Sequence, residues 1–158
     1  MKILVVSDTH RNYNVLEGII GNDPADMLIH LGDGEREFED VSNVFPQFPM
    51  VYVGGNCDYG THKTLHIVKA EGHNILCCHG HTLGVRAGTG LLVSAAVQNG
   101  CDIALYGHTH LYKTEVVNGV HVMNPGSPSE PRGGNKPSYG VIELADGRVD
   151  MKIVILER

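Results

Sequence analysis

The sequence predicts an α/β protein folded as a four-layer αββα sandwich, in which two mixed β-sheets stack face to face and helices cover their outer sides. The first observation is that apolar, strand-like runs alternate with helical segments in the first half of the chain, as in parallel βαβ units. The second is that the other half holds further strands joined by hairpin turns, too many for one doubly wound sheet. The 158 residues fit one domain, residues 1–158, without linker or repeat.

Three strands are expected in the first half. Their apolar runs are nearly uninterrupted, which is typical of strands that are buried on both faces of a sheet. The runs cover residues 3–6, 27–31 and 50–53.

Two helices are expected between these strands. Asn14 followed by Glu17 forms a plausible capping pair for the first helix, which Gly21 would end. The second helix is expected over residues 35–45, where apolar side chains recur near helical spacing and Pro46 follows as a terminator.

The second half begins with a hairpin, then a helix, and closes with two more hairpins. Glu71-Gly72, Asn118-Gly119 and Asp146-Gly147 are the turn signals. The strands they join are 64–68 with 74–78, 112–117 with 120–123, and 138–144 with 148–156. An apolar helix at 89–99, stopped by Gly100, precedes a strand at 102–106.

Five polar clusters each follow an apolar run that is typical of a strand. They are Asp8-Thr9-His10, Gly32-Asp33, Gly54-Gly55-Asn56-Cys57-Asp58, His79-Gly80-His81 and Gly107-His108-Thr109-His110. Ligands of open α/β sheets bind beyond the carboxyl ends of the strands, so clusters that are distant in sequence can meet there. We therefore expect one site built from all five.

The ligand types at these positions predict a metal centre with two ions. One catalytic zinc takes about three protein ligands, whereas this chain offers seven candidates: Asp8, His10, Asp33, Asn56, His79, His108 and His110. Asp33 is the expected bridge, because it is the only acid at its strand end. Four imidazoles favour manganese, iron, cobalt, nickel or zinc over calcium or magnesium, and we take manganese as the first guess.

The charge balance of such a centre suits phosphoryl hydrolysis. Two divalent ions bring four positive charges, and Asp8 and Asp33 remove two of them. The remainder favours hydroxide and a phosphate ester.

The order and residue types of the five clusters resemble the motifs of the calcineurin-like metallophosphoesterases, in particular of their small single-domain prokaryotic phosphodiesterases. The resemblance covers the whole chain and includes the late segment Asn124-Pro125-Gly126-Ser127 with Pro131-Arg132. It implies a phosphodiesterase of small esters, with a hydroxide between the ions as nucleophile. It also implies one metal on Asp8, His10, Asp33 and His110 and the other on Asp33, Asn56, His79 and His108.

One position departs from that family pattern. Many members carry a His after the metal-binding Asn, credited with protonating the leaving group or holding the phosphate, and here the residue is Cys57. A thiol is less suited to acid catalysis, since its unperturbed pKa is about two units above that of His. Thiolate affinity for zinc leaves metal ligation by Cys57 as the minor alternative.

Other polar side chains near the clusters have two readings each. His81 either binds phosphate or supplies the missing acid, or it has a structural hydrogen bond. Arg132 either clamps phosphate or is an ordinary exposed charge, and Asp58 either holds a site residue or caps a turn. His30 is expected to support the site rather than to bind metal. We take Asp33, Asn56 and His81 as catalytic, and Cys57, Asp58, His81 and Arg132 as substrate contacts.

The amino-acid composition limits the remaining classes of function. The net charge of −6 speaks against nucleic-acid binding and hence against a nuclease. The four cysteines contain no C-x-x-C pair, and Cys77, Cys78 and Cys101 are expected to be reduced core thiols. Without a signal peptide or membrane-spanning stretch, a cytoplasmic protein is expected, and the sequence leaves a homo-oligomer open. The alternatives are a phosphomonoesterase and a non-catalytic protein-binding scaffold, similar to a retromer subunit of the same fold.

Overall fold

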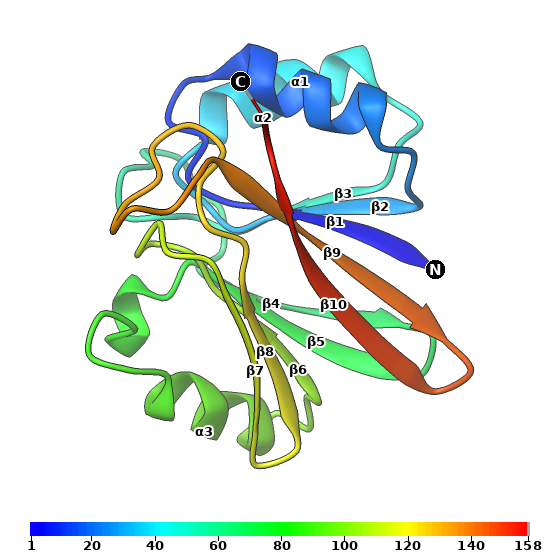
Figure 1. The fold of residues 1–158 in the computed structure, drawn as a ribbon, viewed down its shortest axis with the longest axis vertical. Coiled ribbons are helices and arrows are strands. Elements are labelled where there is room, and N and C mark those ends of the chain that lie inside the picture. The colour runs from blue at the N-terminus through cyan, green and yellow to red at the C-terminus, as the bar shows by residue number, and fades with distance from the viewer. Residues whose placement is uncertain (158) are drawn as a thin grey trace.

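Two five-stranded sheets face each other between helices in the computed structural model, which describes residues 1–157. The helices α1 (Tyr13–Asn22) and α2 (Glu35–Val44) cover the outer side of the first sheet, and α3 (Gly90–Gln98) covers the second (Figure 1). This confirms the predicted αββα sandwich. Arg158, the last residue of the expected domain, lies outside the described residues.

The strand order of the first sheet is β10-β9-β1-β2-β3, and that of the second is β4-β5-β6-β8-β7. The first sheet contains β1 (Lys2–Val6), β2 (Met27–His30), β3 (Met50–Tyr52), β9 (Ser138–Ala145) and β10 (Arg148–Ile155). The second contains β4 (Leu65–Ala70), β5 (His73–Cys78), β6 (Ile103–Leu105), β7 (Lys113–Val117) and β8 (Val120–Asn124). Strands β1, β2 and β3 are parallel, as are β5, β6 and β8, so both sheets are mixed.

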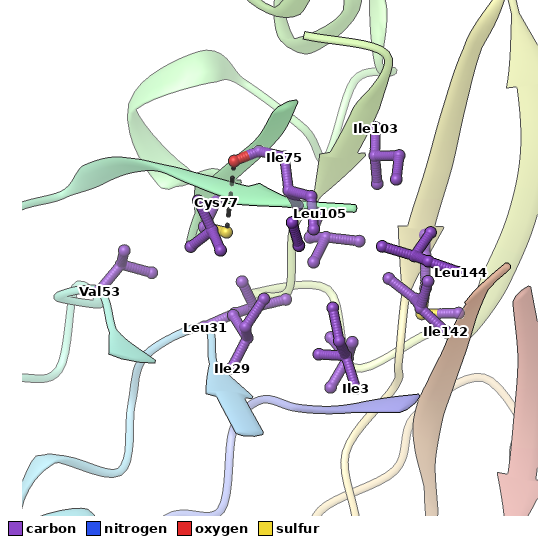
Figure 2. Packing of buried hydrophobic residues seen from close by; sticks show 14 residues of the cluster. Ile3, Ile29, Leu31, Val53, Ile75, Cys77, Ile103, Leu105, Ile142 and Leu144 are labelled. Carbon is purple, nitrogen blue, oxygen red and sulfur yellow. Dashed lines mark hydrogen bonds between the residues drawn. The ribbon is translucent and has the colours of Figure 1, made fainter. Parts of the chain in front are cut away.

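The main hydrophobic core lies between the two sheets. Ile3 and Ile29 of the first sheet face Ile75 and Ile103 of the second, and all four side chains are fully buried (Figure 2). Successive side chains of a strand point to opposite faces, so Leu4 packs instead beneath the helices α1 and α2. Apolar side chains on both faces explain the uninterrupted runs in the sequence.

The helix α1 begins two residues earlier than the capping signal predicted. The side chain of Asn12, not Asn14, accepts a hydrogen bond from the backbone N–H of Val15 (3.2 Å). A turn in which the Asn12 N–H donates to the Thr9 carbonyl (3.0 Å) fixes this start. At the other end the helix continues through Gly21, because the Asp23 N–H still donates to the carbonyl of Ile19 (3.1 Å).

The three predicted hairpin turns are confirmed. Both central residues of each turn have positive φ, as the type I′ turns of tight hairpins require. The φ values are 51° and 79° at Glu71-Gly72, 49° and 77° at Asn118-Gly119, and 53° and 75° at Asp146-Gly147.

The thiols of Cys77, Cys78 and Cys101 are free and buried, as expected. His73, which belongs to none of the five polar clusters, is buried, and its Nδ1 lies 2.5 Å from Asp102 Oδ2. No helix of the described chain is long and apolar enough to cross a membrane.

Candidate metal centre

The loops that follow five strands bring the seven predicted ligands together. Five of these residues have left-handed backbone conformations, which are uncommon outside glycine and cluster at functional sites. They are Asp8 (φ 59°), His10 (φ 42°), Asp33 (φ 57°), His108 (φ 69°) and His110 (φ 59°). Backbone bonds join the loops: the Asp8 N–H donates to the Gly32 carbonyl and the Gly107 N–H to the His79 carbonyl, both at 2.9 Å.

A first group of ligand atoms surrounds the buried carboxylate of Asp8. Its Oδ1 lies 3.2 Å from His110 Nε2 and 3.6 Å from His10 Nε2. The two imidazole nitrogens are 3.2 Å apart. Asp33 Oδ2 lies 3.9 Å from His10 Nε2 and so borders this group.

A second group lies on the other side of Asp33. Its Oδ2 is 3.3 Å from His79 Nε2, which is in turn 3.2 Å from His108 Nδ1. The side-chain oxygen of Asn56 completes the group at 3.0 Å from the same nitrogen of His108. The oxygen Asp33 Oδ2 therefore adjoins both groups.

These separations fit divalent metal ions. Two ligand atoms that are each about 2.1 Å from one ion lie roughly 3.0–3.5 Å apart, which matches most of the distances above. Asp8 Oδ1 is also fully buried and has no hydrogen-bond partner among the described residues. Native proteins rarely leave such an atom unsatisfied. A mixed carboxylate, amide and imidazole donor set around it is what manganese, iron or zinc prefers.

Two of the imidazoles are oriented by backbone carbonyls. His79 Nδ1 lies 2.7 Å from the carbonyl oxygen of Leu31, and His110 Nδ1 lies 2.5 Å from that of Glu130. A carbonyl oxygen only accepts hydrogen bonds, so each Nδ1 carries the proton and each Nε2 keeps a free lone pair toward the centre. Both rings are thus arranged as Nε2 ligands.

The electrostatics of the centre keep its two carboxylates ionised. Burial opposes ionisation of Asp8, but the contacts with His10 and His110 outweigh it and hold the pKa of Asp8 well below its usual range. Burial likewise opposes ionisation of Asp33, and the neighbouring His79 lowers the pKa of Asp33 in spite of it. The neighbouring carboxylate of Asp8 raises the pKa of His10. Burial lowers the pKa of His79, but the contact with Asp33 opposes burial, and the pKa of His79 is raised overall.

These shifts predict that metal binding releases protons. The raised pKa values of His10 and His79 leave these rings more protonated near pH 7 than an ordinary His, whereas ligation requires the neutral ring. Metal affinity should therefore fall as the pH falls through neutrality, and protons released per ion should increase from pH 8 to pH 6.5. Calorimetric titration with Mn²⁺ in buffers of different ionisation enthalpy measures this number. Zero release at pH 6.5 would contradict the assignment of His10 and His79.

The carboxylate of Asp58 holds the backbone of the site. Its Oδ2 accepts hydrogen bonds from the N–H groups of Asp33 (3.0 Å) and Gly55 (2.7 Å) and from the hydroxyl of Tyr52 (2.7 Å). Its Oδ1 accepts from the Glu35 N–H (3.3 Å). Four donors already occupy this carboxylate, which favours the turn-capping role of Asp58 over a substrate contact.

A buried relay supports the loop that carries Asp8 and His10. The Gly32 N–H donates to His30 Nδ1 (3.1 Å), so the neutral ring carries its proton on Nε2, which faces Thr9 Oγ1 at 3.0 Å. Thr9 in turn donates to the buried carboxylate of Glu37, which also accepts from the Arg11 N–H (2.9 Å). Burial lowers the pKa of His30 to about 4, which keeps the ring neutral. His30 therefore supports the site, as expected, while Glu37 carried no recognisable sequence signal.

Cys57 lies at the edge of the centre. Its N–H donates to Asp33 Oδ1 (2.8 Å), and its exposed Sγ lies within 4.8 Å of ligand atoms of His10 and Asp33. Burial and the nearby carboxylate of Asp33 raise the pKa of the thiol. The thiol therefore stays protonated at neutral pH, which disfavours it both as a metal ligand and as an acid.

His81 faces the histidines of the second group. Its ring centroid lies 5.4 Å from that of His79 and 6.2 Å from that of His108. Its Nδ1 is buried and has no hydrogen-bond partner among the described residues. Burial lowers the pKa of His81, so the neutral ring predominates at neutral pH.

Two arginines lie next to histidines of the centre. Arg86, which stood in no motif, donates from Nε to His108 Nε2 (3.0 Å) and so contacts the centre from outside. Arg132 is exposed, and its backbone N–H donates to the carbonyl of His110 (3.3 Å), so the late loop adjoins the site.

A cleft of about 770 Å³ opens beside the first metal group. Its lining includes His10, Asp33, Asn56 and Cys57 together with the first turn of α2 and Glu130. A bound ester can therefore reach these residues from solvent.

Comparison with known proteins agrees with this geometry. The model of the calcineurin-like phosphoesterase superfamily domain matches residues 1–147. The probable metallophosphoesterase YsnB of Bacillus subtilis is 33% identical over 147 residues, which cover 91% of this chain and 85% of YsnB. The phosphodiesterase YfcE of Escherichia coli is 29% identical over 174 aligned positions, covering 90% of this chain and 88% of YfcE.

Solved structures share the fold. A predicted phosphoesterase from Streptococcus pneumoniae superposes with a TM-score of 0.86 at 24% identity, covering 98% of this chain and 88% of that one. Vacuolar protein sorting 29 from Cryptosporidium parvum superposes with a TM-score of 0.76 at 18% identity, covering 99% and 98%. At these identities the structures establish the fold alone. The family model spans all five strand-end loops that form the centre, and YsnB and YfcE match along most of the chain. The chain therefore belongs to the calcineurin-like phosphoesterase superfamily, in its YfcE-like branch.

Proposed function

We propose that this protein is a metal-dependent phosphodiesterase with a dinuclear centre, acting on small phosphate esters. The observation that carries the proposal is the position of Asp33 Oδ2, which lies 3.9 Å from His10 Nε2 and 3.3 Å from His79 Nε2. One carboxylate oxygen thus adjoins both ligand groups. Asp8, His10 and His110 would hold one ion with Asp33, and Asn56, His79 and His108 the other. Manganese is our first choice of metal.

The metal ions, when bound, would supply an activated hydroxide nucleophile and positive charge that stabilises the phosphoryl oxygens. The chain's own residues position these ions and the ester. Backbone contacts from Leu31 and Glu130 fix the rings of His79 and His110, and Asp58 fixes the backbone of Asp33. A fixed geometry of this kind reduces the reorganisation needed during reaction.

His81 is better suited to bind the phosphate than to protonate the leaving group. Its lowered pKa leaves little of the imidazolium form near pH 7, whereas the neutral ring still offers one N–H donor. Cys57 also gives up its proton reluctantly, because its pKa is raised. We infer that the leaving group departs with little help from an acid.

This inference predicts a steep dependence on the leaving group. In a series of aryl methyl phosphates, kcat/KM should fall strongly as the pKa of the leaving phenol rises. Cys57→His should flatten the dependence, accelerating the poorest leaving groups by up to roughly 10²–10⁴-fold if the new ring reaches the leaving oxygen. Cys57→Ser is the matched control and should leave the slope unchanged.

The slope measured for the parent protein decides whether an acid assists the leaving group. A shallow slope would show that an acid is already present, and loss of that shallow slope in His81→Ala would identify His81. Bis(p-nitrophenyl) phosphate should be a better substrate than p-nitrophenyl phosphate. The reverse preference would favour the phosphomonoesterase alternative.

The scaffold alternative rests on the fold shared with Vps29. The seven ligands are all present here and lie at metal-binding separations, which a purely structural protein does not need. This complete set supports an enzyme. The net charge of −6 continues to speak against a nuclease, which would need a basic groove.

A further inference from the structure

The cleft beside the first metal group holds two arginines that the proposed mechanism does not use. Arg11 follows the loop of Asp8 and His10, and Arg36 lies in the first turn of α2. Both side chains line the cleft, as do His10, Asp33 and Asn56. His79, His81 and His108 are not part of its lining. The two arginines therefore extend the site on one side only.

Neither guanidinium group has a partner among the described residues. Arg11 and Arg36 form no ion pair or side-chain hydrogen bond there. Both arginines are exposed, and several carboxylates line the same cleft. Guanidinium groups left unpaired in a cleft that leads to a metal centre can bind an anion with charge-assisted hydrogen bonds.

Most carboxylates that line the cleft already accept hydrogen bonds, largely from backbone N–H groups. Glu35 Oε2 accepts from the N–H groups of Tyr59 (3.2 Å) and Gly60 (3.0 Å). Glu37 accepts from Thr9 and from the Arg11 N–H, and Asp58 accepts four donors as described above. Glu130 is the exception, with its side chain 57% exposed and 4.0 Å from His10 Nε2, toward the metal ligands.

The backbone of Arg11 is held in place by this network. Its φ of 66° is left-handed, and the buried Glu37 carboxylate accepts its N–H at 2.9 Å. Glu37 itself is only 3% exposed. A strained backbone that the surrounding structure fixes is a common feature of ligand-binding segments. The direction in which Arg11 leaves the loop is therefore set by the fold.

We propose that Arg11 and Arg36 bind a second phosphate group of the substrate, so that the substrate is a phosphodiester carrying an additional phosphate beyond the scissile one. This inference rests on the proposed function, because it assumes that the scissile phosphate lies at the metal centre. Two guanidinium groups can hold a phosphate dianion through paired N–H donors. The proposal adds a specificity subsite to the metal-binding residues.

A matched pair of chromogenic substrates tests the subsite in the metal-loaded protein. Thymidine 3′-phosphate 5′-(p-nitrophenyl phosphate) and thymidine 5′-(p-nitrophenyl phosphate) share the leaving group and differ only in the second phosphate. We expect kcat/KM to be about 10- to 100-fold higher for the first, the range of one or two hydrogen bonds to charged groups. In the double variant Arg11→Ala/Arg36→Ala this ratio should fall to about one.

A binding measurement separates this proposal from the proposed function. Calorimetry with thymidine 3′,5′-bisphosphate and thymidine 5′-monophosphate should show tighter binding of the bisphosphate by a similar factor, lost in the double variant. Arg11→Lys/Arg36→Lys should retain part of the difference, because the charge remains without the planar fork. Arg148→Ala, at the start of β10 and outside the lining of the cleft, is the control and should retain the whole ratio.

Each alternative outcome has a definite meaning. Equal affinity of the parent protein for both probes, or a ratio that persists in the double variant, would overturn the subsite. An equal loss on both substrates would also overturn it, because the arginines would then act on the scissile phosphate or on the fold. A bisphosphate preference in binding without hydrolysis of either ester would refute the phosphodiesterase and leave the subsite standing.

Discussion

Removal of divalent metal is expected to abolish hydrolysis of bis(p-nitrophenyl) phosphate, and added manganese is expected to restore it. The physical reason is that no side chain of the centre can replace a metal-activated hydroxide, since metal binding lowers the pKa of water from 15.7 to about 7. Dialysis against a chelator, followed by titration of metal back into the protein, measures the effect. Elemental analysis should find close to two ions per chain at full activity.

The same titration offers clear contradictions. An unchanged rate after chelation would refute the metal-dependent mechanism. Failure of manganese, cobalt, nickel and zinc alike to restore the rate would do so as well. Restoration that is complete at one ion per chain would leave a metal-dependent enzyme but exclude the dinuclear centre.

Asp33→Ala is expected to lose nearly all activity and to disturb both metal groups. Asp33 Oδ2 adjoins His10 on one side and His79 on the other, so its removal would affect both proposed ions. Activity on the aryl diester and metal content after gel filtration measure the change. Asp40→Ala, an exposed aspartate on α2, is the matched control and should keep both.

Variants of the two oriented histidines refine this test. His110→Ala should deplete mainly one metal equivalent and His79→Ala mainly the other, because their Nε2 atoms lie in different groups. Asp33 Oδ1 also accepts the Cys57 N–H, so circular dichroism and thermal unfolding must show that Asp33→Ala remains folded. A folded Asp33→Ala with near-normal turnover would contradict the bridging role.

Much of the fold could be predicted from the sequence because its signals are local. Apolar runs such as residues 3–6 mark strands buried on both faces, and each hairpin turn depends on two adjacent residues. The layer order followed, because strands with two apolar faces must be covered on both sides. The predicted start of α1 was wrong because Asn12 and Asn14 are both residues that can cap a helix. The backbone contact between Asn12 and Thr9, which precedes the helix, placed the cap at Asn12.

The candidate ligands could also be found in the sequence, since each stands directly after a strand. Strand ends that are parallel in a sheet meet at one edge, so their residue types alone indicated a metal centre. Which atoms face one another could not be read in this way. The orientations of His79 and His110, for instance, depend on carbonyl groups that are 48 and 20 residues away.

The sequence by itself thus determined the strands, the turns and the residue types of the centre, because these depend on neighbours along the chain. Only the tertiary structure decided the tasks of the supporting side chains. Asp58 could equally have faced a substrate, and Glu37 resembled any exposed helix acid, until folding enclosed them among backbone N–H donors. The unpaired state of Arg11 and Arg36 has the same origin. A polar side chain in a loop takes its role from the groups that folding places around it, and those groups come from distant parts of the chain.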